Sequence, residues 1–390
     1  MDPTLWFFLI IAVVWLYRAR RALQAFKTIP SVRPAAEHSH SRDLVTVVLP
    51  ARNEEKNIQP CLERLLAQDY PHLQILVAND RSTDATESIL KEMGIPEISR
   101  EEKAPNEKYS RVAYINVPET PAGWTGKNYA VHCAAEFARG QWLLFTDADT
   151  RHETNSVTSV LEHVKKSSLR FLTLIPRCLT GSFLEDMIQP SAMGFLGLWF
   201  PLEKVNSPDE NTIFGNGQFL FIDRELYQEL GGHESVKGEF LEDYAFMRAA
   251  KKLKAPVQGA NGVSIFGTRM YDSFDSMWRG WRRIYLHAFE RRPFRILEKF
   301  LSLMFFSVLP FACFLPMTRM AADFPDTYGF SWGMSVVVLA FIVFTSWKAY
   351  GLIQAKKRFA FLHPVAALLI AMFILDAWIL AVQKKETTWR

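Results

Sequence analysis

The sequence predicts an α/β domain with a mostly parallel sheet, flanked on both sides by apolar helices that span a membrane. Between residues 43 and 297, short β-branched runs alternate with amphipathic segments. This alternation is typical of a parallel sheet with helices on both of its faces. The two ends of the chain, by contrast, are apolar and low in charge.

The first element is an uncharged apolar run over residues 5–17, followed by Arg18, Arg20 and Arg21. Counted from the first residue, it just reaches the roughly 17 residues that a spanning helix needs. A signal peptide would carry its positive charges before the apolar run and a small-residue cleavage site after it, and neither is found. We predict a transmembrane anchor over residues 1–22, with the following chain in the cytosol because positive flanks stay inside.

After the anchor, strand and helix patterns follow one another. Strands are expected at residues 45–50, 73–80, 113–117 and 141–146, and helical patterns at residues 58–68 and 82–93. In a parallel sheet of this kind, ligands bind outside the carboxyl ends of the strands. Three polar clusters follow such ends, at residues 51–53, 79–84 and 147–149. We therefore expect these clusters to converge on one edge of the sheet.

The last of these clusters contains two carboxylates, Asp147 and Asp149, directly after a buried strand. Two such charges are unfavourable there unless a positive group joins them. A divalent cation is one possibility, since Mg²⁺ uses only one or two protein carboxylates and completes its shell with substrate phosphates. The other possibility is a solvated turn in which Asp and Thr150 cap a helix.

The C-terminal part contains three further apolar stretches, at residues 300–316, 329–347 and 359–382. They predict a transmembrane region of two to three spans over residues 300–383. The last span is the weakest, because a carboxylate such as Asp376 inside a spanning helix costs a few kcal/mol. Either that segment is re-entrant or the carboxylate faces protein. The expected location is the cell membrane, with several spans and the α/β domain on the cytoplasmic face.

The composition excludes other classes. A formal net charge of +4 over 390 residues is too small to indicate nucleic-acid binding, so no nucleic-acid partner is expected. The four cysteines form no CxxC pair and have no histidine at metal-site spacing. They are predicted to be buried free thiols in a reducing compartment.

Four strings together resemble the GT-A glycosyltransferases of family 2. They are PARNEEKNI, LVANDRSTDAT, FTDAD and GEFLEDYAFMRAA, and the resemblance covers residues 45–274. The string GWTGKNYA (residues 123–130) is similar to membrane-bound lipid glycosyltransferases of the hopanoid-associated and carotenoid-glucosylating kind. The resemblance implies a cytosolic GT-A catalytic domain, Rossmann-like with a mostly parallel sheet, over residues 43–274.

The resemblance also assigns binding residues. It implies that the nucleotide sugar is held by Pro50, Ala51, Asn53, Asn79, Asp80 and Lys127. Asp80 would accept a hydrogen bond from the base, and Lys127 would lie near the donor phosphates. Asn79 stands where the family commonly has a second aspartate, and its amide oxygen can still accept a bond.

The catalytic residues follow from the same motifs. Asp147 and Asp149 resemble the DxD motif, whose metal (Mg²⁺ or Mn²⁺) bridges the donor diphosphate. Asp243, after Glu242, resembles the general base that takes a proton from the acceptor hydroxyl. Taken without the resemblance, Glu242 and Asp243 also fit an acidic pair that stabilises the first turn of a helix.

Residues 275–297 contain a basic, aromatic, amphipathic pattern, SMWRGWRRIYLHAF at its start. We predict an interfacial helix in the lipid headgroup region. A contact from Arg282 to the donor phosphates is a further possibility. The QxxRW motif of processive family members is absent here, which favours transfer of a single sugar.

Residues 183–202 are apolar at nearly every second or third position. This segment could form a membrane-facing wall of the acceptor site or a buried core helix.

The resemblance therefore implies an inverting, metal-dependent glycosyltransferase. Its donor would be a nucleotide sugar, by family a UDP-hexose, and its acceptor a membrane lipid. Two other functions are considered. One is a processive polysaccharide synthase, and the other is a non-catalytic membrane transport protein with a degenerate nucleotide-binding domain.

Overall fold

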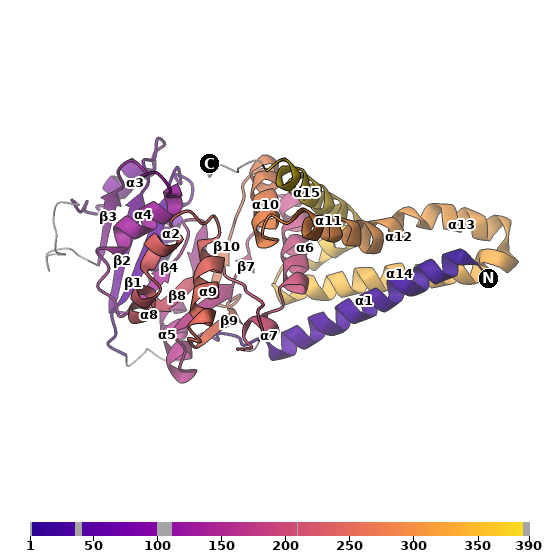
Figure 1. Cartoon of the computed structure of the whole chain (residues 1–390), viewed down its shortest axis with the longest axis horizontal. Coiled ribbons are helices and arrows are strands. Elements are labelled where there is room, and N and C mark those ends of the chain that lie inside the picture. The colour runs from indigo at the N-terminus through magenta and orange to yellow at the C-terminus, as the bar shows by residue number, and fades with distance from the viewer. Residues whose placement is uncertain (1, 36–40, 100–110, 209, 385–390) are drawn as a thin grey trace. The chain divides into compact units, whose positions relative to one another are not determined.

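The computed structural model describes residues 2–35, 41–99, 111–208 and 210–384. These residues form two compact units (Figure 1). The α/β unit comprises residues 29–177 and 202–269, and the helical unit comprises residues 2–28, 178–201 and 270–384.

Within the described residues, the α/β unit is built on a seven-stranded sheet of order β3-β2-β1-β4-β8-β6-β9. Its strands are β1 (Val45–Ala51), β2 (Leu73–Asn79), β3 (Val112–Asn116), β4 (Trp142–Phe145), β6 (Phe171–Ile175), β8 (Leu220–Asp223) and β9 (Val257–Asn261). Strand β1 is parallel to β2 and β4, β2 to β3, and β6 to β9, whereas β8 is antiparallel to its neighbours β4 and β6. The predicted α/β fold with a mostly parallel sheet is therefore confirmed.

Side-chain alternation along the strands produces two hydrophobic cores, one on each face of this sheet. Val47 and Leu49 of β1 lie in the core that includes α2 and α5, and Val48 lies in the core that includes α4 and α9. The helices of the unit are α2 (Ile58–Leu66), α3 (Thr86–Glu92), α4 (Gly126–Ala135), α5 (Ser156–Lys166), α7 (Leu202–Val205), α8 (Arg224–Glu229), η1 (Gly232–Val236) and α9 (Glu242–Lys252). Short strands β5 (Thr150–His152), β7 (Arg177–Cys178) and β10 (Phe266–Thr268) form a second sheet in the order β5-β10-β7.

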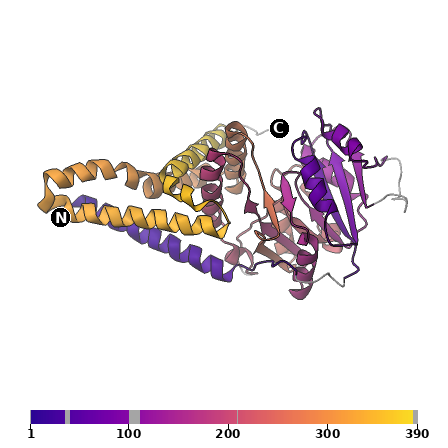
Figure 2. The same ribbon diagram turned by 180° about the vertical axis from the view of Figure 1, so that it is seen from behind.

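The helical unit contains the apolar segments. Its helices are α1 (Pro3–Thr28), α6 (Phe183–Trp199), α10 (Phe274–Ala288), α11 (Pro293–Leu303), the π-helix η2 (Met304–Val308), α12 (Leu309–Ala312), α13 (Phe314–Asp323), α14 (Pro325–Leu352), η3 (Lys357–Leu362) and α15 (His363–Gln383). Figure 1 and Figure 2 both show α1 alongside α14.

Membrane-spanning capacity lies in the segments that the sequence indicates. In the described part of the chain, three helices are long and apolar enough to cross a membrane, over Pro3–Ala25, Pro325–Leu352 and Lys357–Gln383. A bent pair, Pro293–Ala312 with Phe314–Asp323, would make a fourth if the two helices form one span.

Helix α6 lies in the helical unit, although the catalytic domain predicted over residues 43–274 includes it. Its Ile188, Ala192 and Phe195 are buried in a core shared with α10 and α15. A helix that is apolar on most of its surface is buried by whichever partners surround it, and its sequence does not name them. The sequence left open a membrane-facing wall of the acceptor site or a buried core helix. Most side chains of the segment are buried, as in a core helix.

The amphipathic region predicted over residues 275–297 consists of two helices, α10 and α11. They are separated by Glu290 and Arg291, which have positive φ angles of 55° and 54°, and α11 then starts at Pro293. Trp281 is buried and donates a hydrogen bond from Nε1 to Gln189 Oε1 at 2.8 Å. This ring therefore packs against protein instead of lying among lipid head groups.

The carboxylate of Asp376 in α15 faces protein, as one of the two sequence alternatives required. Its Oδ2 accepts hydrogen bonds from Trp278 Nε1 at 2.7 Å and from Arg282 Nη1 at 3.2 Å. The guanidinium of Arg282 balances the charge of Asp376, and the neutral Trp278 N–H adds a hydrogen bond to it.

Candidate active site

The carboxyl ends of β1, β2 and β4 bring the three polar clusters of the sequence to one edge of the sheet. Strand β1 lies between β2 and β4. Strands β1, β2 and β3 follow one another toward one side of the sheet, and the chain then returns to place β4 on the other side of β1. Such a switch point is where open α/β sheets bind ligands. Arg52 follows β1, Asp80 follows β2 and Asp147 comes shortly after β4. The backbone N–H of Asp80 donates to Ala51 O at 2.8 Å, which ties the first two ends together.

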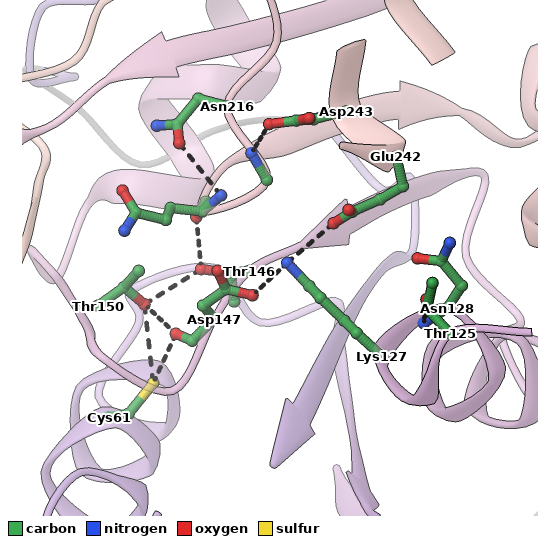
Figure 3. A network of polar contacts seen from close by, with 12 residues as sticks. Cys61, Thr125, Lys127, Asn128, Thr146, Asp147, Thr150, Asn216, Glu242 and Asp243 are labelled. Atoms are coloured by element: carbon green, nitrogen blue, oxygen red, sulfur yellow. Dashed lines mark hydrogen bonds and ion pairs between the residues drawn. The ribbon is translucent and has the colours of Figure 1, made fainter. Parts of the chain in front are cut away.

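Lys127 joins the edge of the sheet to the start of α9 (Figure 3). Its Nζ lies 2.9 Å from Asp147 Oδ1 and 2.8 Å from Glu242 Oε1. Burial by itself would lower the pKa of Lys127, but the two carboxylates raise it well above its ordinary value. The ammonium therefore remains charged and holds together residues that lie far apart in the sequence.

Asp243 is held in one orientation by two backbone N–H groups. Its Oδ2 accepts from Gly217 N and its Oδ1 from Tyr244 N, both at 2.7 Å. Burial, and then the neighbouring Glu242, raise the pKa of Asp243 to about 6. A fixed carboxylate with a raised pKa is suited to accept a proton at neutral pH.

The approach of the 215–217 segment to Asp243 requires glycine. A Cβ on Gly215 would lie 2.4 Å from the backbone carbon of Asp243, and one on Gly217 would lie 3.0 Å from Glu242 Oε1. Any side chain at position 215 would therefore push the segment away from the start of α9.

Asp149 is a buried carboxylate with a raised pKa. Burial, and then Asp147, raise its pKa to about 8. Its Oδ1 is buried, and no residue in the described ranges forms a hydrogen bond with it. Within those same ranges, no group of three or more His, Cys, Asp or Glu side chains could hold a metal ion. Asp147 and Asp149 therefore fit a cation that takes its remaining ligands from a substrate or from water.

The residues expected to bind the nucleotide connect two neighbouring loops. Asp80 accepts from Arg52 at 3.4 Å and pairs with Arg81 at 2.8 Å. Asn53 has a φ of 56°, and its side-chain oxygen accepts from Thr83 N at 2.8 Å.

The other predicted nucleotide residues lie in the strands themselves. Asn79, at the end of β2, donates from Nδ2 to Asn116 Oδ1 at 2.7 Å. Pro50 and Ala51 are the last residues of β1. Arg282 belongs to the helical unit, where it bonds to Asp376, and its contact with donor phosphates stays a prediction.

Sequence reasoning missed Asn128, which follows Lys127 in the string GWTGKNYA. Its Nδ2 donates to Val236 O at 2.7 Å and to Glu239 O at 2.9 Å. These bonds fix the start of α4, and with it Lys127, against the segment that leads to Glu242. An asparagine in the first turn of a helix, where its own side chain is not the cap, was the available signal.

A buried polar network supports the turn that carries Asp147 (Figure 3). Thr146 Oγ1 lies 3.1 Å from Thr150 Oγ1 and 3.0 Å from His152 Nε2, and donates to Gln218 O at 2.8 Å. Burial lowers the pKa of His152 to about 3, so this imidazole is neutral. Because His152 is buried and neutral, its role is to support the turn that carries Asp147.

The four cysteines are free thiols, as predicted. Cys61 and Cys133 are buried, whereas Cys178 and Cys313 are only partly buried. Burial raises the pKa of the Cys61 thiol to about 12, which makes it unreactive.

Comparison with known proteins identifies relatives of this domain. Residues 46–231 match the family model described as glycosyl transferase family 2. The chain is 26% identical over 243 residues to the 4,4'-diaponeurosporenoate glycosyltransferase of Staphylococcus haemolyticus (strain JCSC1435). It is 25% identical over 244 residues to the protein of the same name from Staphylococcus aureus (strain USA300). Each match covers 61% of this chain and only 60% of the relative.

Solved structures are more distant. The mannosyltransferase PcManGT from Pyrobaculum calidifontis, in complex with GDP-Man and Mn²⁺, has a TM-score of 0.48 and 17% identity, and 97% of this chain and 96% of that chain are covered. The S. aureus TarS 1–349 structure in complex with UDP has a TM-score of 0.41 and 16% identity, with 89% and 94% covered.

Proposed function

From the match of residues 46–231 to the family model described as glycosyl transferase family 2, we propose that the protein transfers a single sugar from a nucleotide sugar to a membrane lipid. The family match confirms the resemblance that the sequence motifs indicate. The observation that carries the proposal is the cluster of Lys127, Asp147, Asp149, Glu242 and Asp243 at one edge of the sheet. It combines a cation, a carboxylate pair suited to a metal and an oriented base.

The donor side of the proposed reaction uses the carboxylate pair. Asp147 and Asp149 would hold Mg²⁺ or Mn²⁺, which supplies Lewis-acid stabilisation of the departing diphosphate when bound. Lys127 adds a permanent positive charge beside them, at 2.9 Å from Asp147. We propose a UDP-hexose as the donor, in line with the family resemblance, bound along the loops of Asn53 and Asp80.

The acceptor side uses Asp243. Its carboxylate would take the proton of the acceptor hydroxyl as that oxygen attacks the anomeric carbon of the sugar. The bonds from Gly217 N and Tyr244 N keep it in place without neutralising it. One displacement by one nucleophile inverts the configuration at the anomeric carbon, so we propose an inverting enzyme.

A lipid acceptor is supported by two observations. The names of the curated relatives state 4,4'-diaponeurosporenoate as the molecule that is glycosylated. In this chain, the described residues also include three helices able to span a membrane. We propose a multi-pass protein of the cell membrane whose catalytic domain lies on the cytoplasmic face.

The test is sugar transfer by the purified full-length chain in detergent. A panel of radiolabelled nucleotide sugars would be incubated with Mg²⁺ or Mn²⁺ and total membrane lipid. Wild-type protein should form a labelled glycolipid that disappears with chelator, and Asp243→Asn and Asp149→Ala should not form it. Glu162→Gln, an exposed acidic position on α5, is the matched control and should behave as wild type. Failure of the wild-type protein to bind any nucleotide sugar would overturn the proposal and favour the transport alternative.

A further inference from the structure

A cation without an anionic partner lies among the helices of the helical unit. Arg18 of α1 donates from Nη2 to Ser302 Oγ at 3.1 Å and from Nη1 to Ser307 Oγ at 3.4 Å. Its guanidinium carbon lies 5.2 Å from the ring centre of Trp15 and 5.3 Å from that of Phe306. In the part of the chain that the structure describes, Arg18 forms no ion pair with a carboxylate.

The backbone next to Arg18 departs from a regular α-helix. Ser307 is fully buried and belongs to the π-helix η2, which interrupts the run from α11 to α12. The indole N–H of Trp15 donates to Phe306 O in this turn at 2.7 Å. Short π-helical turns of this kind frequently occur at functional sites.

A second polar group, His363, also contacts Trp15. The rings of Trp15 and His363 are 5.3 Å apart, and His363 is buried at the start of α15. Ser346 Oγ donates to Ile342 O, so it accepts from the Nδ1–H of His363 at 2.9 Å. The imidazole Nε2 is then a buried acceptor, and no described residue donates to it.

These groups require a ligand of defined chemistry. A partly buried guanidinium that bonds only to hydroxyls and rings is unfavourable. Ionisable residues within membrane segments usually mark a site with a specific partner. The elements that carry Arg18, Ser302 and His363 are the end of the first span and the beginnings of later ones. In the topology proposed above, all three positions lie on the cytoplasmic side, where anionic lipids are concentrated.

We propose that Arg18, Ser302, Ser307 and His363 form a binding site for the anionic head group of a membrane lipid. The guanidinium and the two serine hydroxyls bind the anionic oxygens. A hydroxyl of the same head group donates to His363 Nε2. The contacts of this site do not depend on the sugar transfer proposed above, and only its depth in the membrane rests on the proposed topology.

The experiment is native mass spectrometry of the full-length chain in detergent. Phosphatidylglycerol, phosphatidylcholine and inorganic phosphate are titrated separately, because the first has both an anionic phosphate and head-group hydroxyls. Wild-type protein should retain phosphatidylglycerol in preference to the other two. Arg18→Gln should lower that affinity about tenfold, which corresponds to about 1.4 kcal/mol. Arg20→Gln removes the same charge at an exposed position of the same helix and should bind as wild type.

Three outcomes would overturn the proposal. Equal retention of phosphatidylcholine and phosphatidylglycerol by wild type would remove the anionic preference, whether or not any variant folds. An equal loss of phosphatidylglycerol affinity in Arg18→Gln and Arg20→Gln would show that only the overall positive charge of the surface matters. Binding of inorganic phosphate as tight as that of the lipid would assign the site to a free anion. Sugar transfer is not measured, so these outcomes are independent of the proposed enzymatic function.

Discussion

At the scale of single residues, the two buried carboxylates Asp149 and Asp243 differ in the hydrogen bonds that they accept. Both have raised pKa values, to about 8 and about 6, and desolvation is the main cause for each. Asp243 receives two backbone hydrogen bonds that favour its charged form, whereas Asp149 Oδ1 has no such bond among the described residues. The difference fits a base for Asp243 and a cation ligand for Asp149.

The raised pKa of Asp243 predicts the pH dependence of sugar transfer. A general base works only when it is ionised, so at saturating divalent cation the rate should fall about tenfold for each pH unit below 6. The measurement is kcat for glycolipid formation between pH 5 and pH 8. Asp243→Asn should lower kcat by about 10²- to 10⁴-fold at every pH. A flat profile down to pH 5 in wild type would contradict the assignment of the base.

The raised pKa of Asp149 predicts how cation affinity depends on pH. Below pH 8 a proton occupies this carboxylate, and a cation must displace it. The affinity for Mn²⁺ should therefore decrease about tenfold per pH unit between pH 8 and pH 6, measured by isothermal titration calorimetry with UDP present. Asp149→Asn should bind Mn²⁺ more weakly and lose this pH dependence, and the same slope in the variant would refute the role of Asp149.

At the scale of elements, the N-terminus of α4 organises the site. Thr125 caps the helix through its side chain, and Lys127 extends to Asp147 and Glu242. Asn128 bonds to the last residue of η1 and to the segment after it. Helix α4 therefore sets the distance between the sheet edge and the start of α9.

Asn128→Ala tests this organising role. It removes the side-chain donor to Glu239 O and one of the two donors to Val236 O, which still accepts from Glu239 N at 2.9 Å. A net loss of about 1 kcal/mol for each lost hydrogen bond is expected. We expect a lower free energy of unfolding in urea and a higher KM for the donor, because Lys127 is no longer held. Asn211→Ala, at an exposed position, is the control and should change neither quantity. An unchanged KM in Asn128→Ala would confine Asn128 to a role in stability.

At the scale of the whole molecule, the apolar helices predict a topology that can be measured. With Arg18, Arg20 and Arg21 on the inside, we expect the α/β unit to lie in the cytosol and the break between α13 and α14 to lie outside.

Two introduced cysteines test this topology. Asp323→Cys should react with a membrane-impermeant maleimide on intact cells, and Glu162→Cys should react only after the membrane is opened. Labelling of the wild-type protein measures the background reaction of the partly buried Cys178 and Cys313. Labelling of Glu162→Cys on intact cells would reverse the proposed orientation.

Much of the site could be predicted because its residues follow local rules. The β-branched run before Pro50 and the apolar run before Asn79 are recognisable as strands without knowledge of their neighbours. Asp147 follows such a run directly, and the carboxyl ends of parallel strands meet at one edge whatever the details of packing. For this reason the positions of Asp147 and Asp80 at that edge followed from spacing alone.

Other parts depend on contacts between distant residues. Asn128 is 108 residues from Val236 and 111 from Glu239. The need for glycine at position 215 arises only because the backbone of Asp243 approaches it. Neither requirement leaves a periodic pattern in the sequence.

The sequence by itself determined the class of fold, the apolar segments able to span a membrane and the carboxylates of the candidate site. Each of these depends on local periodicity or on residues that follow directly after a strand. Only the tertiary structure decided that β8 runs antiparallel, that α6 packs with α10 and α15, and that Lys127 bridges Asp147 and Glu242. The physical reason is that side-chain packing and ion pairing depend on distances in space, and a single sequence specifies which groups are available but not which of them meet.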